Sequence, residues 1–167
     1  VAVTHNSEKI LKNLNIWNLF PKKLVSIIKE AKVLDGNSPY FLNFNHNEIK
    51  RDNLGYLIPN HIIKKTLYKK LKNISNVTLL SGIECLSIKP NNEYSSVVLS
   101  NGKKIKTSLV VAADGRFSKM RSKMGLSAFI RNFNKDMIVC RMKHEKSHKN
   151  TAYEFFRYNQ TQAILPY

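Results

Sequence analysis

Acidic side chains are scarce in this sequence. Asp and Glu number 11 against 28 Lys and Arg, which gives a formal net charge of +17. Such an excess of positive charge is typical of proteins that bind nucleic acid or an anionic membrane. The cations are, however, 22 Lys and only 6 Arg, a composition expected when A and T dominate the coding DNA. We therefore predict no nucleic-acid site from charge alone, and a basic nucleic-acid- or membrane-binding module remains the alternative function.

Cysteines and long apolar runs are also few. Cys85 and Cys140 lie far apart in apolar, strand-like surroundings, which excludes a disulfide framework and fits free thiols in a reducing compartment. No apolar run approaches the roughly 18 residues of a membrane-spanning helix. The first residues, VAVTHNSEKILKNL, have no signal-peptide pattern. We expect a cytoplasmic chain whose basic surface allows peripheral contact with the inner membrane.

Hydrophobic periodicity predicts a mixed α/β fold. Helices are expected over 7–19, begun by Ser7 and ended before Pro21, and over 59–74, where apolar residues recur at helical spacing. Two strands around a turn within 22–58 are expected in a mixed sheet. The other expected elements are a strand over 77–80, a β-meander over 82–107, a buried parallel strand over 108–113, a short helix ending at Gly125, and strands over 127–133, 137–145, 151–158 and 162–167.

The segment HEKSH, from His144 to His148, matches the H-E-x-x-H pattern of zinc peptidases. That chemistry needs a helix, because only i, i+4 spacing on a helix points both imidazoles at one ion. The preceding MIVCRM is β-branched and apolar, and the following residues are turn-like. We therefore expect a polar turn between two strands and no metal site.

The most specific motif is SLVVAADGRFSKMR, residues 108–121. An apolar strand, an Ala-Asp-Gly turn and a following helix match D-G-x-x-S-x-x-R, with Asp114, Gly115, Ser118 and Arg121 in the fixed positions. At the carboxyl end of a parallel strand, glycine lets the backbone pass close to a dinucleotide, and a carboxylate can accept hydrogen bonds from it. The motif on its own is equally compatible with an ordinary turn that Asp114 caps.

Together with LGYLIPNHIIKKTLYKKL before it and MKHEKSHKNTAYEFFRYNQTQAILPY after it, this motif resembles a known family along the whole chain. The sequence is similar to the ubiquinone-biosynthesis ring hydroxylases of the UbiH/UbiF/VisC type, which are para-hydroxybenzoate-hydroxylase-like FAD monooxygenases. In that family the segment matching HEKSH is a strand-loop-strand region without zinc. The resemblance implies an enzyme that uses FAD, NAD(P)H and O₂ to hydroxylate the ring of a polyprenyl phenol.

The resemblance also implies roles for individual residues. Asp114 and Gly115 would serve FAD and nicotinamide binding, and Arg121 would anchor the turn. Asn60 would lie near the flavin, and the backbone around Cys85 would lie by the adenine. No catalytic proton donor is identified.

The fold implied is a partial FAD-binding, Rossmann-like domain with a β-meander, plus part of a mixed-sheet substrate domain. Residues 1–21 and 59–126 would belong to the first, and residues 22–58 and 127–167 to the second. The family's G-x-G-x-x-G unit and its flavin-binding Gly-Asp motif are not found in the sequence. The resemblance therefore implies an internal fragment with an incomplete FAD site, inactive alone unless separately encoded flanking fragments complete it.

Overall fold

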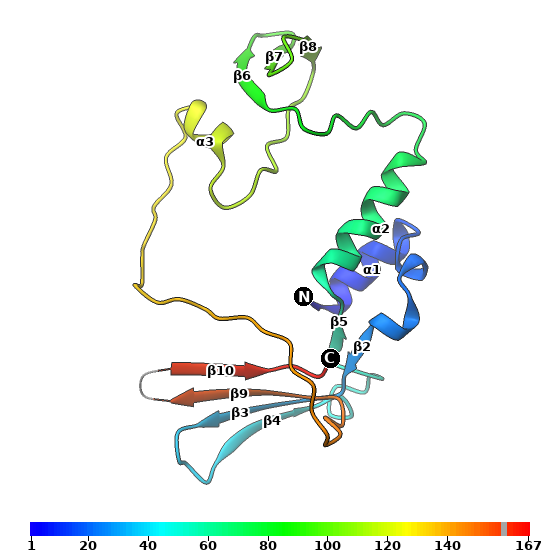
Figure 1. Ribbon diagram of the computed structural model, residues 1–167, viewed down its shortest axis with the longest axis vertical. Helices are drawn as coiled ribbons and strands as arrows, with labels where there is room; N and C mark the ends of the chain where they lie inside the picture. Colours follow the sequence, from blue (N-terminus) through cyan, green and yellow to red (C-terminus); the bar gives the residue numbers. More distant parts are fainter. Residues whose placement is uncertain (158–159) are drawn as a thin grey trace. The chain divides into compact units, whose positions relative to one another are not determined.

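The computed structural model describes residues 1–157 and 160–167 (Figure 1). Tyr158, at the end of the strand expected over 151–158, lies outside the described residues. The chain divides into two compact units. Unit 1 comprises Val1–Thr78 and Met142–Tyr167, and unit 2 comprises Leu79–Arg141.

Helix α1 spans His5–Asn13 at the start of unit 1. The Thr4 hydroxyl caps it by accepting a hydrogen bond from the Ser7 N–H at 3.3 Å. Asn15 adopts a φ of 54°, which ends the helix, and a 3₁₀ turn, η1, follows over Trp17–Leu19. The helix expected over 7–19 therefore exists, but both of its expected ends are wrong. The cap lies three residues earlier, and the left-handed asparagine stops the α-helix well before the proline.

The hydrophobic core of unit 1 forms around Ile58, whose side chain is fully buried. Val3, Ile16 and Phe20 are also buried and pack with it. Partly buried residues pack against this cluster: Leu11, Trp17, Val25, Tyr56, Ile62, Ile63 and Leu67. Helix α2, Asn60–Lys72, supplies Ile62, Ile63 and Leu67 from its apolar stripe. The helix expected over 59–74 is confirmed, and its inner face is fixed to the core.

A small antiparallel sheet, in the order β1-β5-β2, lies beside this core. Strand β1 is Ala2–Val3, β2 is Ser26–Ile28 and β5 is Gly55–Leu57. A 3₁₀ turn, η2, over Lys22–Leu24 leads into β2. A Cβ at Gly55 would lie 2.9 Å from the Val3 carbonyl oxygen, so glycine allows the close approach of β1 and β5.

The larger sheet of unit 1 is mixed, in the order β10-β9-β3-β4 (Figure 1). Strands β3, Glu30–Asp35, and β4, Phe41–Asn45, form an antiparallel hairpin. Strand β9, Thr151–Arg157, pairs in parallel with β3 and antiparallel with β10, Gln160–Ile164. The two strands expected within 22–58 and the two C-terminal strands are thus present, and they share one sheet. The last of them begins at Gln160 and ends at Ile164, rather than spanning 162–167 as expected.

Unit 2 contains an antiparallel meander followed by a short helix. Its strands are β6, Cys85–Pro90, β7, Ser95–Leu99, and β8, Lys104–Thr107. Helix α3 spans Lys119–Lys123, and the chain turns at Gly125 with a φ of 71°. The meander and the short helix are confirmed.

Four expected strands are wrong: residues 77–80, 108–113, 127–133 and 137–145 belong to no helix or strand of the described chain. Leu109 and Val111, expected in a buried parallel strand, are 73% and 76% exposed. An apolar run becomes a strand only when a neighbour satisfies its backbone N–H and C=O groups. Within the described residues no strand pairs with these four segments. The mixed α/β class with several sheets is nevertheless confirmed.

Candidate functional site

Asp114 organises the turn that leads into α3 in unit 2. One carboxylate oxygen accepts a hydrogen bond from the Ser118 hydroxyl at 2.5 Å, and the other accepts one from the Met120 N–H at 3.1 Å. The Ser118 oxygen in turn accepts a hydrogen bond from the Arg121 N–H at 3.0 Å, as a helix N-cap does. The D-G-x-x-S-x-x-R spacing therefore closes a local hydrogen-bonded turn.

These hydrogen bonds lower the pKa of the Asp114 carboxyl, first through the Ser118 hydroxyl and then through the Met120 N–H. Because the pKa is lower in the folded turn than in the unfolded chain, ionised Asp114 stabilises the turn above about pH 4. That contribution is lost as the pH falls through the folded-state pKa.

Substituting Ser118 tests this arrangement. We expect Ser118→Ala to raise the Asp114 pKa toward its ordinary value, because the strongest hydrogen bond to the carboxylate is removed. The loss of the N-cap should also destabilise α3 by about 1 kcal/mol. The measurement is a pH titration of the Asp114 carboxyl carbon by NMR. Ser122→Ala is the control, because the Ser122 hydroxyl contacts the Ser118 carbonyl and not the carboxylate; an equal shift in both variants would contradict the assignment.

Gly115 follows Asp114 with a φ of 87°, a conformation that L side chains rarely adopt. Apart from Gly115 itself and its two chain neighbours, no described residue has an atom within 4 Å of the position that a Cβ would take. The backbone conformation alone therefore requires glycine here.

A matched pair of glycines separates strain from ligand contact. Gly102, in the turn between β7 and β8, has a φ of 81° and equally open surroundings. We expect Gly115→Ala and Gly102→Ala to lower the free energy of unfolding by the same amount, about 1 kcal/mol. If a cofactor passes Gly115, only Gly115→Ala should also weaken cofactor binding. This is measured by cofactor titration after the chain has been joined to the missing segments of a complete FAD enzyme. Equal cofactor affinities in the two variants would contradict a ligand contact at this glycine.

Arg121 and Cys85 both lie near this turn. The two terminal nitrogens of Arg121 are each 3.5 Å from the Arg116 carbonyl oxygen, so the guanidinium reaches back across the turn. Cys85 is half-buried at the start of β6, and its thiol lies 3.8 Å from the Ser87 carbonyl oxygen. The structure therefore brings Asp114, Gly115 and Arg121 together on one turn.

Two lysines of α3 hold the start of β6 against that helix. Lys119 pairs with Glu84 at 3.0 Å, and Lys123 donates a hydrogen bond to the Leu86 carbonyl at 2.8 Å. The hydrogen bond from Lys119 lowers the pKa of Glu84. These contacts flank Cys85 on both sides. Sequence reasoning did not identify them, because lysines separated from their partners by more than 30 residues give no local signal.

Asn60 belongs to unit 1, whereas the Asp114 turn belongs to unit 2. It is the exposed first residue of α2, directly after Pro59. The position of Asn60 is fixed because the buried segment 57–59 directly before it connects β5 to the helix. The five residues predicted to bind cofactor thus lie on two units, four of them in unit 2.

HEKSH is not helical. His144 and His148 lie in an irregular segment with ring centroids 5.7 Å apart in an edge-to-face contact. Asn150 donates its N–H to His148 Nδ1 at 2.9 Å, and His144 Nδ1 contacts the Lys146 carbonyl. The strand expected before this segment is absent from the described chain, but the expected polar loop is present. Among the described residues no group of three or more His, Cys, Asp or Glu side chains could hold a metal.

We therefore expect the purified chain to retain no stoichiometric zinc after dialysis, since the two imidazoles contact each other without a third ligand. Metal content is measured by plasma mass spectrometry on the chain and on His144→Ala. Near-stoichiometric zinc that disappears in His144→Ala would overturn this prediction.

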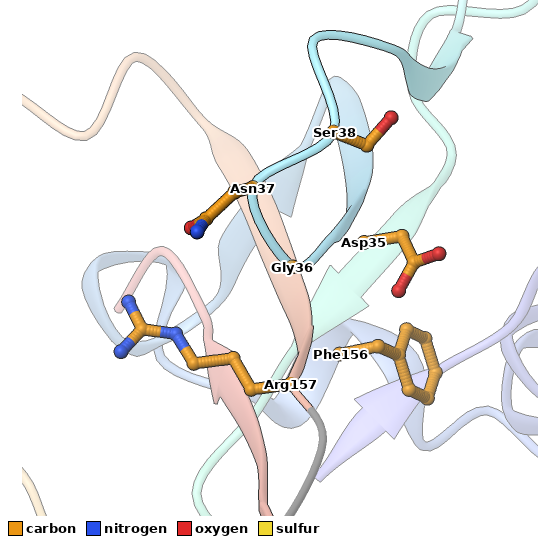
Figure 2. Close-up of a pocket in the computed structure, with 6 residues that line it drawn as sticks. All are labelled: Asp35, Gly36, Asn37, Ser38, Phe156 and Arg157. Carbon is orange, nitrogen blue, oxygen red and sulfur yellow. The ribbon is translucent and has the colours of Figure 1, made fainter.

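A pocket of about 440 Å³ lies at the β3–β4 turn of unit 1 (Figure 2). Its lining residues are Asp35, Gly36, Asn37, Ser38, Phe156 and Arg157. The Gly36 N–H donates to the Phe156 carbonyl at 2.7 Å, which ties the turn to the end of β9. The pocket contains none of the residues predicted to bind a cofactor, and we assign it no function.

Comparison with curated proteins gives long, nearly full matches to this chain. The Neisseria meningitidis ubiquinone hydroxylase UbiM is 38% identical over 170 residues, covering 99% of this chain and 37% of that protein. The Rhodospirillum rubrum ubiquinone hydroxylase UbiL is 28% identical over 99% of this chain and 38% of its own length. The chain is related to the ubiquinone-biosynthesis hydroxylases. The resemblance inferred from sequence is confirmed, and the chain spans a little over one third of each relative's length. No protein-family model matches it.

Solved structures show the same fold at low sequence identity. HpxO from Klebsiella pneumoniae, complexed with FAD and uric acid, matches with a TM-score of 0.68 at 12% identity, over 99% of this chain and 43% of its own. The p-nitrophenol 4-monooxygenase PnpA from Pseudomonas putida matches with a TM-score of 0.62 at 18% identity, over 75% and 33%. This chain thus shares its fold with part of each of these two proteins.

Proposed function

We propose that this chain forms part of an FAD-dependent monooxygenase that uses NAD(P)H and hydroxylates the ring of a polyprenyl phenol in ubiquinone biosynthesis. The observation that carries the proposal is the 38% identity to UbiM over nearly the whole chain. The solved neighbours support it, since a structure complexed with FAD shares the fold. The relatives do not favour the alternative, in which the chain is a basic nucleic-acid- or membrane-binding module in place of an enzyme part. The chain spans only part of the relatives, so we propose that it is inactive by itself.

The residues of the α3 turn fit a dinucleotide. We propose that Asp114 and Gly115 bind FAD or the nicotinamide, that Arg121 anchors the turn, and that the backbone at Cys85 lies by the adenine. Two observations support this: the φ of 87° at Gly115 lets the backbone turn without a side chain, and the Asp114 carboxylate is exposed to a ligand. We place Asn60 near the flavin by resemblance alone. When bound, FAD supplies the O₂-activating chemistry, with two electrons delivered by NAD(P)H.

We also propose the division into two partial domains. Residues 1–21 and 59–126 would belong to the FAD-binding part, and residues 22–58 and 127–167 to the substrate-binding sheet. The parallel pairing of β3 with β9 supports it, because it joins the two segments assigned to the sheet. No described helix is long and apolar enough to cross a membrane. We propose a cytoplasmic location with peripheral contact to the inner membrane, where a polyprenyl substrate resides.

A chimera tests the function. This chain replaces the matching 170 residues of UbiM, so that the remaining segments of the enzyme are present. We expect the chimera to bind FAD, seen as yellow flavin absorbance, and to hydroxylate the ubiquinone precursor that the parent hydroxylates. A chimera that is folded by circular dichroism but colourless would contradict the FAD assignment. One that binds FAD without hydroxylating that precursor would contradict the substrate class.

A further inference from the structure

The outer face of α2 is a continuous basic stripe. Helix α2 contains no Asp or Glu. The exposed residues at helical spacing along this face, which we name the α2 stripe, are His61, Lys64, Lys65, Tyr68, Lys69 and Lys72. Spacings of three and four residues place these side chains on one side of the helix. The stripe extends over about 16 Å at 1.5 Å per residue.

No acidic side chain neutralises the stripe within the described residues. The ion pairs of the described chain join Lys12 to Glu8, Lys32 to Glu30 and Lys119 to Glu84. None of them involves α2. Lys65 and Lys69, four residues apart, repel one another and so destabilise the helix. The charge of the stripe is therefore available to an external anion.

Helix stability alone does not account for the stripe. Lys69 and Lys72 lie in the last turn, where cations interact favourably with the helix dipole. Lys64 and Lys65 lie in the first half of the helix, where that interaction is absent or unfavourable. The inner face is held by Ile62, Ile63 and Leu67 against the core. The helix therefore presents its lysines in a fixed orientation.

We propose that the α2 stripe binds the surface of an anionic lipid bilayer. Tyr68, 56% exposed in the middle of the stripe, has an amphipathic ring suited to the headgroup region. The choice of a membrane also rests on the proposed function, because a polyprenyl substrate partitions into the bilayer.

Flotation with lipid vesicles tests this proposal, since bound protein rises in the gradient while aggregated protein sinks. The probe is phosphatidylcholine vesicles with about one third phosphatidylglycerol, an anionic lipid. The 167-residue chain should float with these vesicles, should not float with pure phosphatidylcholine, and should be released at about 1 M salt. Each lysine near an anionic surface contributes about fivefold to binding. Changing Lys64, Lys65, Lys69 and Lys72 together to Gln should therefore weaken binding more than tenfold.

The control changes four exposed lysines of unit 2 to Gln: Lys89, Lys103, Lys104 and Lys135. It removes the same net charge and should keep most of the binding. The proposal is overturned if the unsubstituted chain stays at the bottom of the gradient, if the α2 variant floats as well as the unsubstituted chain, or if the control loses as much binding. Binding to single-stranded RNA without flotation would assign the stripe to nucleic acid instead. The assay needs neither FAD nor substrate, so its failure is distinct from failure of the chimera.

Discussion

An Ile58→Ala chain is expected to lose about 2 to 5 kcal/mol of unfolding free energy in unit 1. The Ile58 side chain is fully buried and packs with Val3, Ile16 and Phe20. Alanine removes the buried methyl groups and leaves a cavity, because the surrounding backbone is fixed by the β1–β5 pairing. The measurement is urea unfolding followed by fluorescence of Trp17, which packs against this cluster.

Ile10→Ala is the matched control, because the same atoms are removed from a side chain that is 59% exposed on α1. We expect a change within about 0.5 kcal/mol for it. Comparable losses in the two variants would show that Ile58 is not the centre of the core. A large effect for Ile58→Ala alone matters for function as well, because Ile58 directly precedes Pro59 and Asn60 at the start of α2.

Asp114→Ala is expected to weaken FAD or NAD(P)H binding by about tenfold or more in the UbiM chimera, because a charge-assisted hydrogen bond to the cofactor is lost. The carboxylate can make such a bond. Asp114 is exposed, so a ligand can reach the carboxylate alongside the hydrogen bonds from Ser118 and Met120. The affinity is measured by flavin fluorescence quenching and by NADPH titration.

Ser118→Ala is the control for this prediction, because it removes the contact with the carboxylate and the helix cap but keeps the carboxylate itself. If Asp114 acts only as a structural cap, both variants should lower the melting temperature and change cofactor affinity to the same small extent. If Asp114 contacts the cofactor, Asp114→Ala should lose clearly more affinity than Ser118→Ala. Unchanged cofactor binding in Asp114→Ala with a lowered melting temperature would reject the cofactor assignment.

Elements built from local signals could be predicted from the sequence. The apolar stripe of α2, the hairpin of β3 and β4, the meander and the turn at Asp114 all appear where the residue pattern placed them. In each case the backbone hydrogen bonds join near neighbours in the sequence, and the residue pattern marks which side chains face inward. The related family could also be identified, because the D-G-x-x-S-x-x-R motif and its flanking segments carry specific residue types at fixed spacings.

The tertiary structure decided what depends on distant partners. The sequence did not show that β9 pairs in parallel with β3, which brings Thr151 beside Glu30. It also did not show the partly buried hydrogen bond that the Tyr56 hydroxyl donates to Glu8. The apolar runs at 108–113 and 137–145 have a strand pattern, but within the described chain they have no strand to pair with and are largely exposed. Residue pattern sets what a segment can form, whereas backbone pairing and burial require a partner that local sequence does not specify.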